Sequence, residues 1–476
     1  SAYRIEGKDV IRFELGKYDP SLALVIDPIA LRWATWVNSN SASAGSGTDG
    51  HNHGHGIWVD PSDGAIYIAA RVDGKTDNIT PGALETTQNG GVDLIVGKYF
   101  EPTSIGGAGQ RVWQTYIGGS NDDNPYAMEQ GPDGNLYITG YTGSADFPLI
   151  GGTGFGASGG IDHRSQSSDN IFVLKINKSG NSIKSAVIGG DGTDNSYDLR
   201  LTPAGDVLVC GNTSSKNLGS QYSGTGALDR SSGYKGGNDV ILFKLNQNLT
   251  AVQWMKNYGG TGSSSSNNKD VASIMLMHPV SGDIFVAGYT NATNFPISSN
   301  ARQTSLGGSQ SGFIQKFTSS GAQVWSSYFS SASGKSASIL CMEFNAARNK
   351  LYFGGVTSGL QAPSNMPASG VYDNSYNGGS NDFFVACMDT NQNFITSTYI
   401  GGASNEVNMM GLNVDLNNDV YVFGYTNSTN FPVTADALQS NLNNTSSNGS
   451  NPSNDKVFFK LPSTLSAGPL YSTYYG

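Results

Sequence analysis

One segment of this chain recurs six times, and the recurrence limits the possible folds more than any other feature. The run at residues 135–142 (NLYITGYT) returns most clearly at 283–290 (DIFVAGYT) and at 419–426 (DVYVFGYT). Weaker copies stand at 65–72, 206–213 and 350–357. Equivalent positions in successive copies lie 67 to 77 residues apart. Because self-similarity at a fixed period indicates a repeat architecture, we expect six units of about 70 residues.

Each unit contains four segments with the character of β-strands, always in the same order. The first is short and ends in a turn, and the second is the recurring run. The third is apolar and usually ends in lysine, as at 171–175, and the fourth is aromatic and often ends in Gly-Gly, as at 113–119. Runs of β-branched and aromatic residues between Gly, Asn and Asp turns are typical of strands. No helical periodicity competes with them.

A single four-stranded sheet of this size must stack on copies of itself to bury its two faces. Antiparallel four-stranded units repeated around an axis form a β-propeller. We therefore predict an all-β propeller over residues 31–476, preceded by an N-terminal β segment at 1–30. The six repeats are expected at about 55–124, 125–195, 196–270, 271–337, 338–407 and 408–476.

The number of blades stays open at this point. The pattern of the fourth strand occurs a seventh time, at 33–37, ahead of the first full unit. In one arrangement residues 1–37 supply a seventh blade, and in the other six blades close the ring while these strands dock outside it. The strand-like runs concerned are 3–6, 10–15, 23–27 and 31–37.

Composition favours an extracellular or cell-surface protein and excludes some partners. Charged residues make up only 13% of the chain, and the net charge is 27 − 37 = −10. Nucleic acid and anionic membranes both require basic patches, so we expect neither as a partner. No apolar run approaches the roughly 18 residues that span a bilayer, so we expect no membrane insertion. The first residues lack an apolar signal core, so any export signal would lie outside this chain.

The chain resembles a known family of repeats. The pattern Gly-Tyr-Thr-x-x-x-Asx-Phe-Pro occurs at 140–148, 288–296 and 424–432, together with the Lys-ended third strand and the Tyr-rich Gly-Gly strand. These features resemble the SBBP-type (seven-bladed β-propeller) repeats of large bacterial surface and secreted proteins, over about residues 31–476. The resemblance implies an extracellular or cell-surface location, in some members through type IX secretion, and a role in scaffolding or adhesion. It transfers no catalytic residue.

Two groups of residues are candidate metal sites. The first is a dense cluster formed by Asp49, His51, His53 and His55. In an extended segment alternating residues share one side, so the three histidines would lie together. Neutral imidazoles bind Zn²⁺, Ni²⁺ or Cu²⁺. The alternative, which we favour, is a solvated loop. Acidic residues also follow the fourth strands, at Asp123, Asp194, Asp270 and Glu406.

These acidic links are expected near the central channel, where carboxylates could hold Ca²⁺ through oxygen ligands. We favour the alternative that they cap turns by accepting hydrogen bonds from nearby backbone N–H groups. In five units a lysine ends the third strand, and Cys387 stands at this place in the remaining unit. We predict that the aliphatic stems of these lysines pack against the blade while their ammonium groups stay in water. The lysines are Lys98, Lys175, Lys244, Lys316 and Lys460. Cys210, Cys341 and Cys387 are expected to be small buried residues without a disulfide.

The leading functional hypothesis is a non-catalytic extracellular scaffold for adhesion, assembly or binding of a protein or glycan. Loops on a rigid scaffold commonly carry binding, and the fold alone does not fix the ligand. Partners are expected on a cell surface or among other domains of a larger parent protein. Two alternatives remain, a secreted carbohydrate-active enzyme with carboxylates at the channel mouth and a structural filament subunit. No catalytic residue or organic cofactor site is predicted.

Overall fold

The computed structural model describes most of the chain, which divides into two compact units. The described residues are 2–6, 10–14, 53–72, 79–102, 109–151, 162–163, 168–218, 228–229, 235–261, 269–362, 364–443 and 455–476. The smaller unit is formed by Ser1–Trp36 and Glu101–Gln110, and the larger by Val37–Phe100 and Arg111–Gly476. In the smaller unit, β1 (Ala2–Glu6) and β2 (Val10–Glu14) pair as an antiparallel hairpin.

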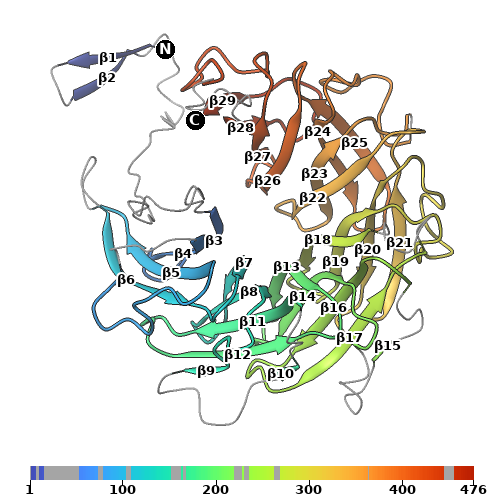
Figure 1. Ribbon diagram of the computed structural model, residues 1–476. Helices are drawn as coiled ribbons and strands as arrows, with labels where there is room; N and C mark the ends of the chain where they lie inside the picture. Colours follow the sequence, from blue (N-terminus) through green and yellow to red (C-terminus); the bar gives the residue numbers. More distant parts are fainter. Residues whose placement is uncertain are drawn as a thin grey trace. The chain divides into compact units, whose positions relative to one another are not determined.

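The larger unit contains six sheets that follow one another in chain order (Figure 1). The first sheet consists of β3 (His53–Val59), β4 (Ile66–Val72), β5 (Asp93–Phe100) and β6 (Gln110–Ile117). The second has β7 (Asp123–Gln130), β8 (Leu136–Thr142), β11 (Asn170–Ile176) and β12 (Ile183–Ile188), with short β9 (Ile150–Gly151) and β10 (Asp162–His163) added to β12. The third has β13 (Asp194–Leu201), β14 (Val207–Thr213), β16 (Asp239–Leu245) and β17 (Val252–Tyr258), with short β15 (Leu228–Asp229).

The last three sheets have four strands each. The fourth consists of β18 (Asp270–Met277), β19 (Ile284–Thr290), β20 (Ser311–Phe317) and β21 (Gln323–Phe329). The fifth has β22 (Ala337–Phe344), β23 (Lys350–Thr357), β24 (Asp382–Asp389) and β25 (Phe394–Ile400). The sixth has β26 (Glu406–Val414), β27 (Val420–Thr426), β28 (Asp455–Leu461) and β29 (Tyr471–Tyr475).

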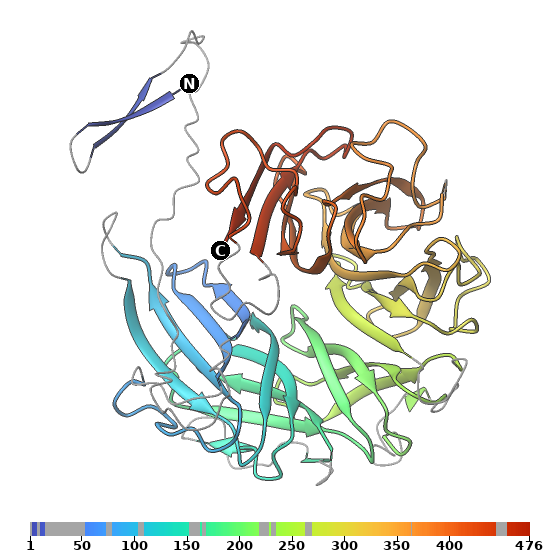
Figure 2. The same cartoon turned by 45° about the horizontal axis from the view of Figure 1, so that its top comes forward.

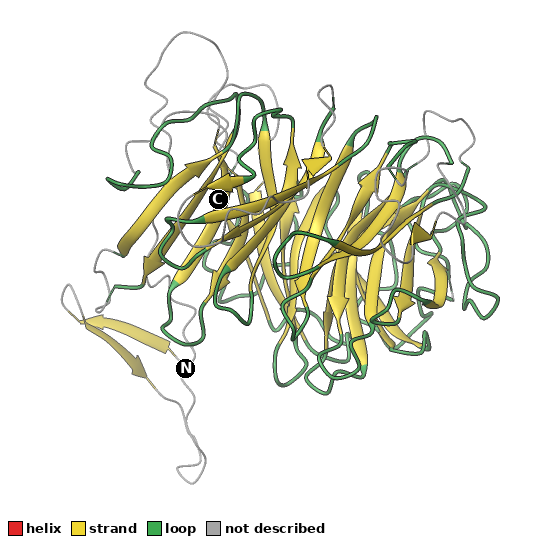
Figure 3. Cartoon of the chain, turned by 90° about the horizontal axis from the view of Figure 1, so that it is seen from below, coloured by secondary structure: helices red, strands yellow, loops and turns green. Residues whose placement is uncertain are grey.

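The larger unit is thus a six-bladed β-propeller, as the repeat predicts. The four main strands of each blade pair antiparallel in chain order, and the first strand of each blade lies nearest the axis (Figures 1 and 2). Only strands and loops occur among the described residues (Figure 3). The alternative of a seventh blade is wrong, because the described sheets give six. Of the runs proposed for it, 23–27 and 31–37 lie outside the described residues.

A bulge in the first strand explains the glycine of the recurring run. In the fourth blade the register shifts between Ala272 and Ile274, and Ala272 pairs with Gly288. A Cβ atom added at Gly288 would overlap the carbonyl oxygen of Val271. Because this bulge brings the backbone of β18 unusually close to β19, only glycine fits at position 288 without a shift. The first blade has Ala70 opposite its own bulge, where the partner is Gly54. Gly140, Gly211 and Gly355 meet the same obstruction in their own blades.

Neighbouring blades pack face to face through five hydrophobic clusters. Each cluster combines the second and third strands of one blade with those of the next, from the first blade to the sixth. Phe147, Phe295 and Phe431 of the Phe-Pro pairs are buried in these clusters, and Phe295 stacks on Phe313 with ring centroids 4.6 Å apart. The Phe-Pro pairs therefore anchor loops between blades.

The lysines that end the third strands form ion pairs with carboxylates of the turn before the second strand. The Nζ–oxygen distances are 3.2 Å for Lys98–Asp63, 2.7 Å for Lys175–Asp133, 2.9 Å for Lys244–Asp206, 2.9 Å for Lys316–Asp283 and 3.0 Å for Lys460–Asp419. The predicted packed stems are present, and each ammonium group pairs with a carboxylate, which the prediction did not include. The side chain of Lys175 is only 6% exposed. The three cysteines are buried and free, as predicted.

Candidate functional site

A cavity of about 720 Å³ lies where the six blades meet around the axis. Every blade contributes to its wall from the first strand, and the first, fourth and sixth blades also contribute from the second strand. Most of these residues are aromatic, aliphatic or sulfur-containing. One representative from each blade, in chain order, is Ile57, Tyr126, Tyr197, Tyr289, Leu340 and Phe423. Because the first strands are innermost (Figure 1), the ring itself assembles this surface from residues far apart in the sequence.

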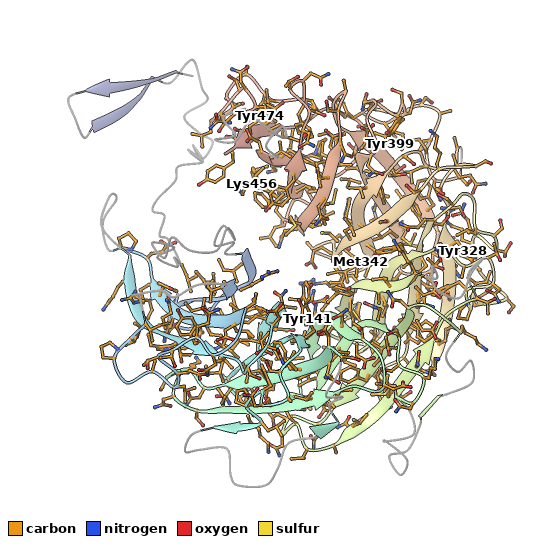
Figure 4. All side chains as sticks on the ribbon, viewed as in Figure 1. Tyr141, Tyr328, Met342, Tyr399, Lys456 and Tyr474 are labelled. Carbon is orange, nitrogen blue, oxygen red and sulfur yellow. The ribbon has the colours of Figure 1, made fainter. Side chains whose placement is uncertain are left out.

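Tyrosines of the second and third blades form an aromatic pair in the wall, and Tyr289 and Phe423 add further rings. The rings of Tyr126 and Tyr197 meet edge to face with centroids 5.2 Å apart, a favoured geometry for aromatic pairs. The ring centroids of Tyr126 and Tyr141 lie 6.1 Å apart. Figure 4 labels Tyr141 at the inner edge of the second blade. Burial raises the pKa of Tyr126, Tyr197 and Tyr289. Their hydroxyl groups therefore stay neutral at physiological pH.

The described part of the cavity wall carries no charged side chain. None of the described residues that line it is an aspartate, glutamate, lysine, arginine or histidine. Pockets of this kind, mainly apolar with a few polar groups, are the usual sites for ligands. The arrangement is suited to holding a ligand by stacking and apolar contact, with tyrosine hydroxyls and the Asn408 amide as the polar groups of the wall.

The four acidic links lie in the blade junctions, outside the cavity wall. Asp123, Asp194, Asp270 and Glu406 are fully buried, and each is the first residue of an innermost strand. Each accepts a hydrogen bond from the backbone N–H of a glycine in the preceding Gly-Gly pair and from the threonine hydroxyl that ends the second strand of its own blade. Asp123, Asp194 and Glu406 also accept from a serine two residues after that threonine. In the sixth blade the donors to Glu406 are Gly402 N at 3.2 Å, Thr426 Oγ1 at 2.9 Å and Ser428 Oγ at 2.7 Å.

A second carboxyl group accompanies three of these acids, which the sequence analysis did not foresee. The partner begins the third strand of the preceding blade, in the pairs Asp93 with Asp123, Asp239 with Asp270, and Asp382 with Glu406. A Cβ atom at Gly401 would lie 2.6 Å from Glu406 Oε2 and 2.7 Å from Asp382 Oδ1, so the two carboxyl groups converge over that glycine. Apart from each other, these two oxygens have no hydrogen-bond partner.

Burial shifts the titration of these groups. It raises the pKa of Asp123 and of Asp239 to about 7, although hydrogen bonds to both act in the opposite direction. Burial also raises the pKa of Asp382 and of Glu406, which interact with each other. Two buried carboxyl groups that face each other favour a shared proton. Among the described residues no group of three or more His, Cys, Asp or Glu side chains is placed to hold a metal ion.

The histidine cluster falls largely outside the described part of the chain. Asp49 and His51 are not described, and of His53 and His55 the structure describes only the backbone, at the start of β3. The axial cavity, in contrast, was missed by sequence reasoning. A signal existed in Tyr126 and Tyr197, which stand three residues after Asp123 and Asp194 in successive repeats.

Two segments of the chain, residues 112–148 and 397–432, match the SBBP β-propeller repeat family. Each segment runs from the fourth strand of one blade to the Phe-Pro pair of the next, so the chain carries SBBP repeats at these two places. No curated protein matches the chain. No helix among the described residues has the length and apolar character needed to cross a membrane.

Solved structures resemble the chain only in fold. A polysaccharide lyase of family PL25, an ulvan lyase, is 10% identical with a TM-score of 0.40, over 89% of this chain and 83% of its own. The hemagglutinin-neuraminidase of parainfluenza virus 5 is 9% identical with a TM-score of 0.32, over 89% of each chain. The WD40 β-propeller domain of Doa1 is 8% identical with a TM-score of 0.30, over 79% of this chain and 90% of its own. Such values assign no activity to this chain.

Proposed function

We propose that this chain is a non-catalytic β-propeller, secreted or displayed on a cell surface, that binds a glycan or protein ligand in its axial cavity. The observation that carries this proposal is the composition of the cavity wall. All six blades supply it, its tyrosine rings offer flat apolar faces, and its described residues carry no acid or base. Aromatic faces of this kind supply contact area at low entropic cost.

The placement of the carboxyl groups supports binding over hydrolysis. A glycosidase of the usual type needs two carboxyl groups that reach the bond they cleave. Asp123, Asp194, Asp270 and Glu406 have no exposed surface and are absent from the cavity wall. The low charged fraction and the SBBP repeats support an extracellular location for this scaffold.

Removing one ring from the cavity is expected to weaken ligand binding about tenfold. The purified chain is applied to an array of surface polysaccharides, oligosaccharides and extracellular proteins, and the strongest binder is measured again with Tyr197→Ala. Loss of one aromatic contact is worth roughly 0.5–1.5 kcal/mol beyond its buried area, and 1.4 kcal/mol is tenfold in affinity.

Tyr372→Ala is the matched control, because Tyr372 lies outside the cavity and its side chain is 37% exposed. Its binding should equal that of the unmodified chain. Equal binding by Tyr197→Ala would contradict the proposed site. Turnover of a polysaccharide by the purified chain, abolished by a single Asp→Asn substitution, would favour the carbohydrate-active enzyme instead.

A further inference from the structure

The ion pairs between third-strand lysines and turn carboxylates follow a positional rule. In the third, fourth and sixth blades the carboxylate comes directly before the second strand, at Asp206, Asp283 and Asp419. In the first two blades it stands three residues before that strand, at Asp63 and Asp133. Each pair fills the space between the turn and the third strand of its blade.

The fifth blade reverses this rule at both positions. Cys387 takes the place of the lysine, since it pairs with Tyr352 as Lys460 pairs with Tyr421 in the sixth blade. Lys350 takes the place of the carboxylate, directly before Leu351. Burial raises the pKa of the Cys387 thiol to about 11, so the thiol stays neutral. None of the ion pairs among the described residues includes the Lys350 ammonium.

A cavity of about 460 Å³ occupies the space beside this altered pair. The fifth blade supplies Lys350, Tyr352 and Thr396 to its wall, and the sixth blade supplies Asn418 and Ser463. The Tyr352 hydroxyl donates to the carbonyl oxygen of Ser463 at 2.9 Å, which ties the two blades together at the cavity. A volume of this size accommodates a small ligand such as one or two sugar rings.

The wall combines three kinds of contact. Lys350 offers one unpaired positive charge in a protein whose net charge is −10. Thr396 and Ser463 offer hydroxyl groups, and Asn418 offers its amide N–H groups, since its Oδ1 already accepts from Ala346 N at 3.1 Å. Val371 and Ile395 add apolar surface. Together these groups suit a singly charged anion that also carries several hydroxyl groups and an apolar face.

We propose that the fifth-blade pocket binds an acidic sugar residue, whose carboxylate pairs with Lys350 and whose hydroxyl groups bond to Thr396, Ser463 and Asn418. The pocket is separate from the axial cavity and uses none of its residues. A lysine is a point charge that attracts an anion without fixing its orientation. The surrounding hydroxyl and amide groups therefore supply the selectivity for a sugar over a simple anion.

Isothermal titration calorimetry of the full chain with glucuronate tests the proposal. Glucose, which lacks the carboxylate, and acetate, which lacks the hydroxyl groups, should each bind at least tenfold more weakly than glucuronate. Lys350→Gln should lose at least tenfold in glucuronate affinity. Lys456→Gln, which alters a lysine of the sixth blade outside the pocket, should leave that affinity unchanged.

A second variant separates the loss of the site from the loss of the fold. The double substitution Lys350→Asp with Cys387→Lys rebuilds the ion pair of the third, fourth and sixth blades and fills the pocket. It should retain the unfolding midpoint of the unmodified chain and lose glucuronate binding. The proposal fails if glucuronate does not bind, if acetate binds equally well, or if either variant keeps full affinity.

Discussion

We expect Gly288→Ala to destabilise the propeller by about 3 kcal/mol or more. The added Cβ would overlap the carbonyl oxygen of Val271, which belongs to the backbone of the adjacent bulged strand. Relief requires a shift of β18 against β19, in a blade whose Val286 and Ala287 are fully buried. Overpacking of a well-packed region typically costs about 1–3 kcal/mol of stability. Here the added atom meets backbone, which cannot rotate away as a side chain can, so we expect a cost at or above the upper end of that range. The measurement is the free energy of unfolding in urea.

Gly411→Ala is the control for this substitution. Gly411 also lies in an innermost strand, β26, but a Cβ there would meet no atom within 4 Å. Its free energy of unfolding should stay within about 0.5 kcal/mol of the unmodified chain, as for most open surface positions. Equal effects of the two substitutions would show that contact with the bulge is not the cause.

The second large effect is a fall in stability as pH rises through neutrality. Asp123 and Asp239 have a folded-state pKa of about 7, above the value near 4 of the unfolded chain. Between these values the folded protein keeps protons that the unfolded chain has released. Their stabilising contribution is therefore complete below about pH 4 and is lost as pH rises through about 7. The unfolding temperature should fall from pH 5 to pH 8.

The substitution Glu406→Gln should remove the pH dependence that the junction between the fifth and sixth blades contributes. The amide oxygen can accept from Thr426 and Ser428 as Glu406 Oε1 does, and the NH₂ group can donate to the unpartnered Asp382 Oδ1. Because the amide does not ionise, we expect a gain of about 1–3 kcal/mol at pH 8, the cost of one buried unsatisfied group, and little change at pH 5. A loss of stability at pH 8 would contradict the shared proton.

Other carboxylates oppose this trend at low pH. The pKa of Asp133 and of Asp415 is lowered although burial acts in the opposite direction. The main opposing hydrogen bonds come from Lys175 to Asp133, and from the backbone N–H of Asp419 and then Lys460 to Asp415. Their contribution is present above the unfolded-state pKa and is lost as pH falls below it. The two groups of carboxyls together place the stability maximum on the acidic side of neutrality.

The period and order of the strands could be predicted because they are local properties of the sequence. Every copy of the run at 135–142 is rich in β-branched, aromatic or other apolar residues between turns, and this pattern does not depend on the register of pairing. The recurring glycine within this run is plain in the sequence, but the structural reason for a glycine at that position is not. The obstruction at Gly288 arises from a bulge in another strand, which only the register reveals.

The functional surfaces were harder to predict because they depend on the ring. Tyr126 and Tyr289 line one cavity only because their strands lie about a common axis. The acidic residue Glu406 was correctly placed beside turn donors, yet its partner Asp382 comes from the preceding blade, and the sequence alone does not give their distance. The turn carboxylates that pair with the third-strand lysines could have been predicted from the sequence, since Asp206 and Asp419 occupy the same place in their repeats.

The five clusters between blades have a consequence for how the molecule opens. Among the described residues a comparable cluster does not join the sixth blade to the first, and Ile57 of the first blade is 69% exposed. In a linear array each unit draws stability from its neighbours, so a unit with one neighbour opens most readily. Fraying should therefore begin at the terminal blades, while the third and fourth, held on both sides, exchange their amide hydrogens last.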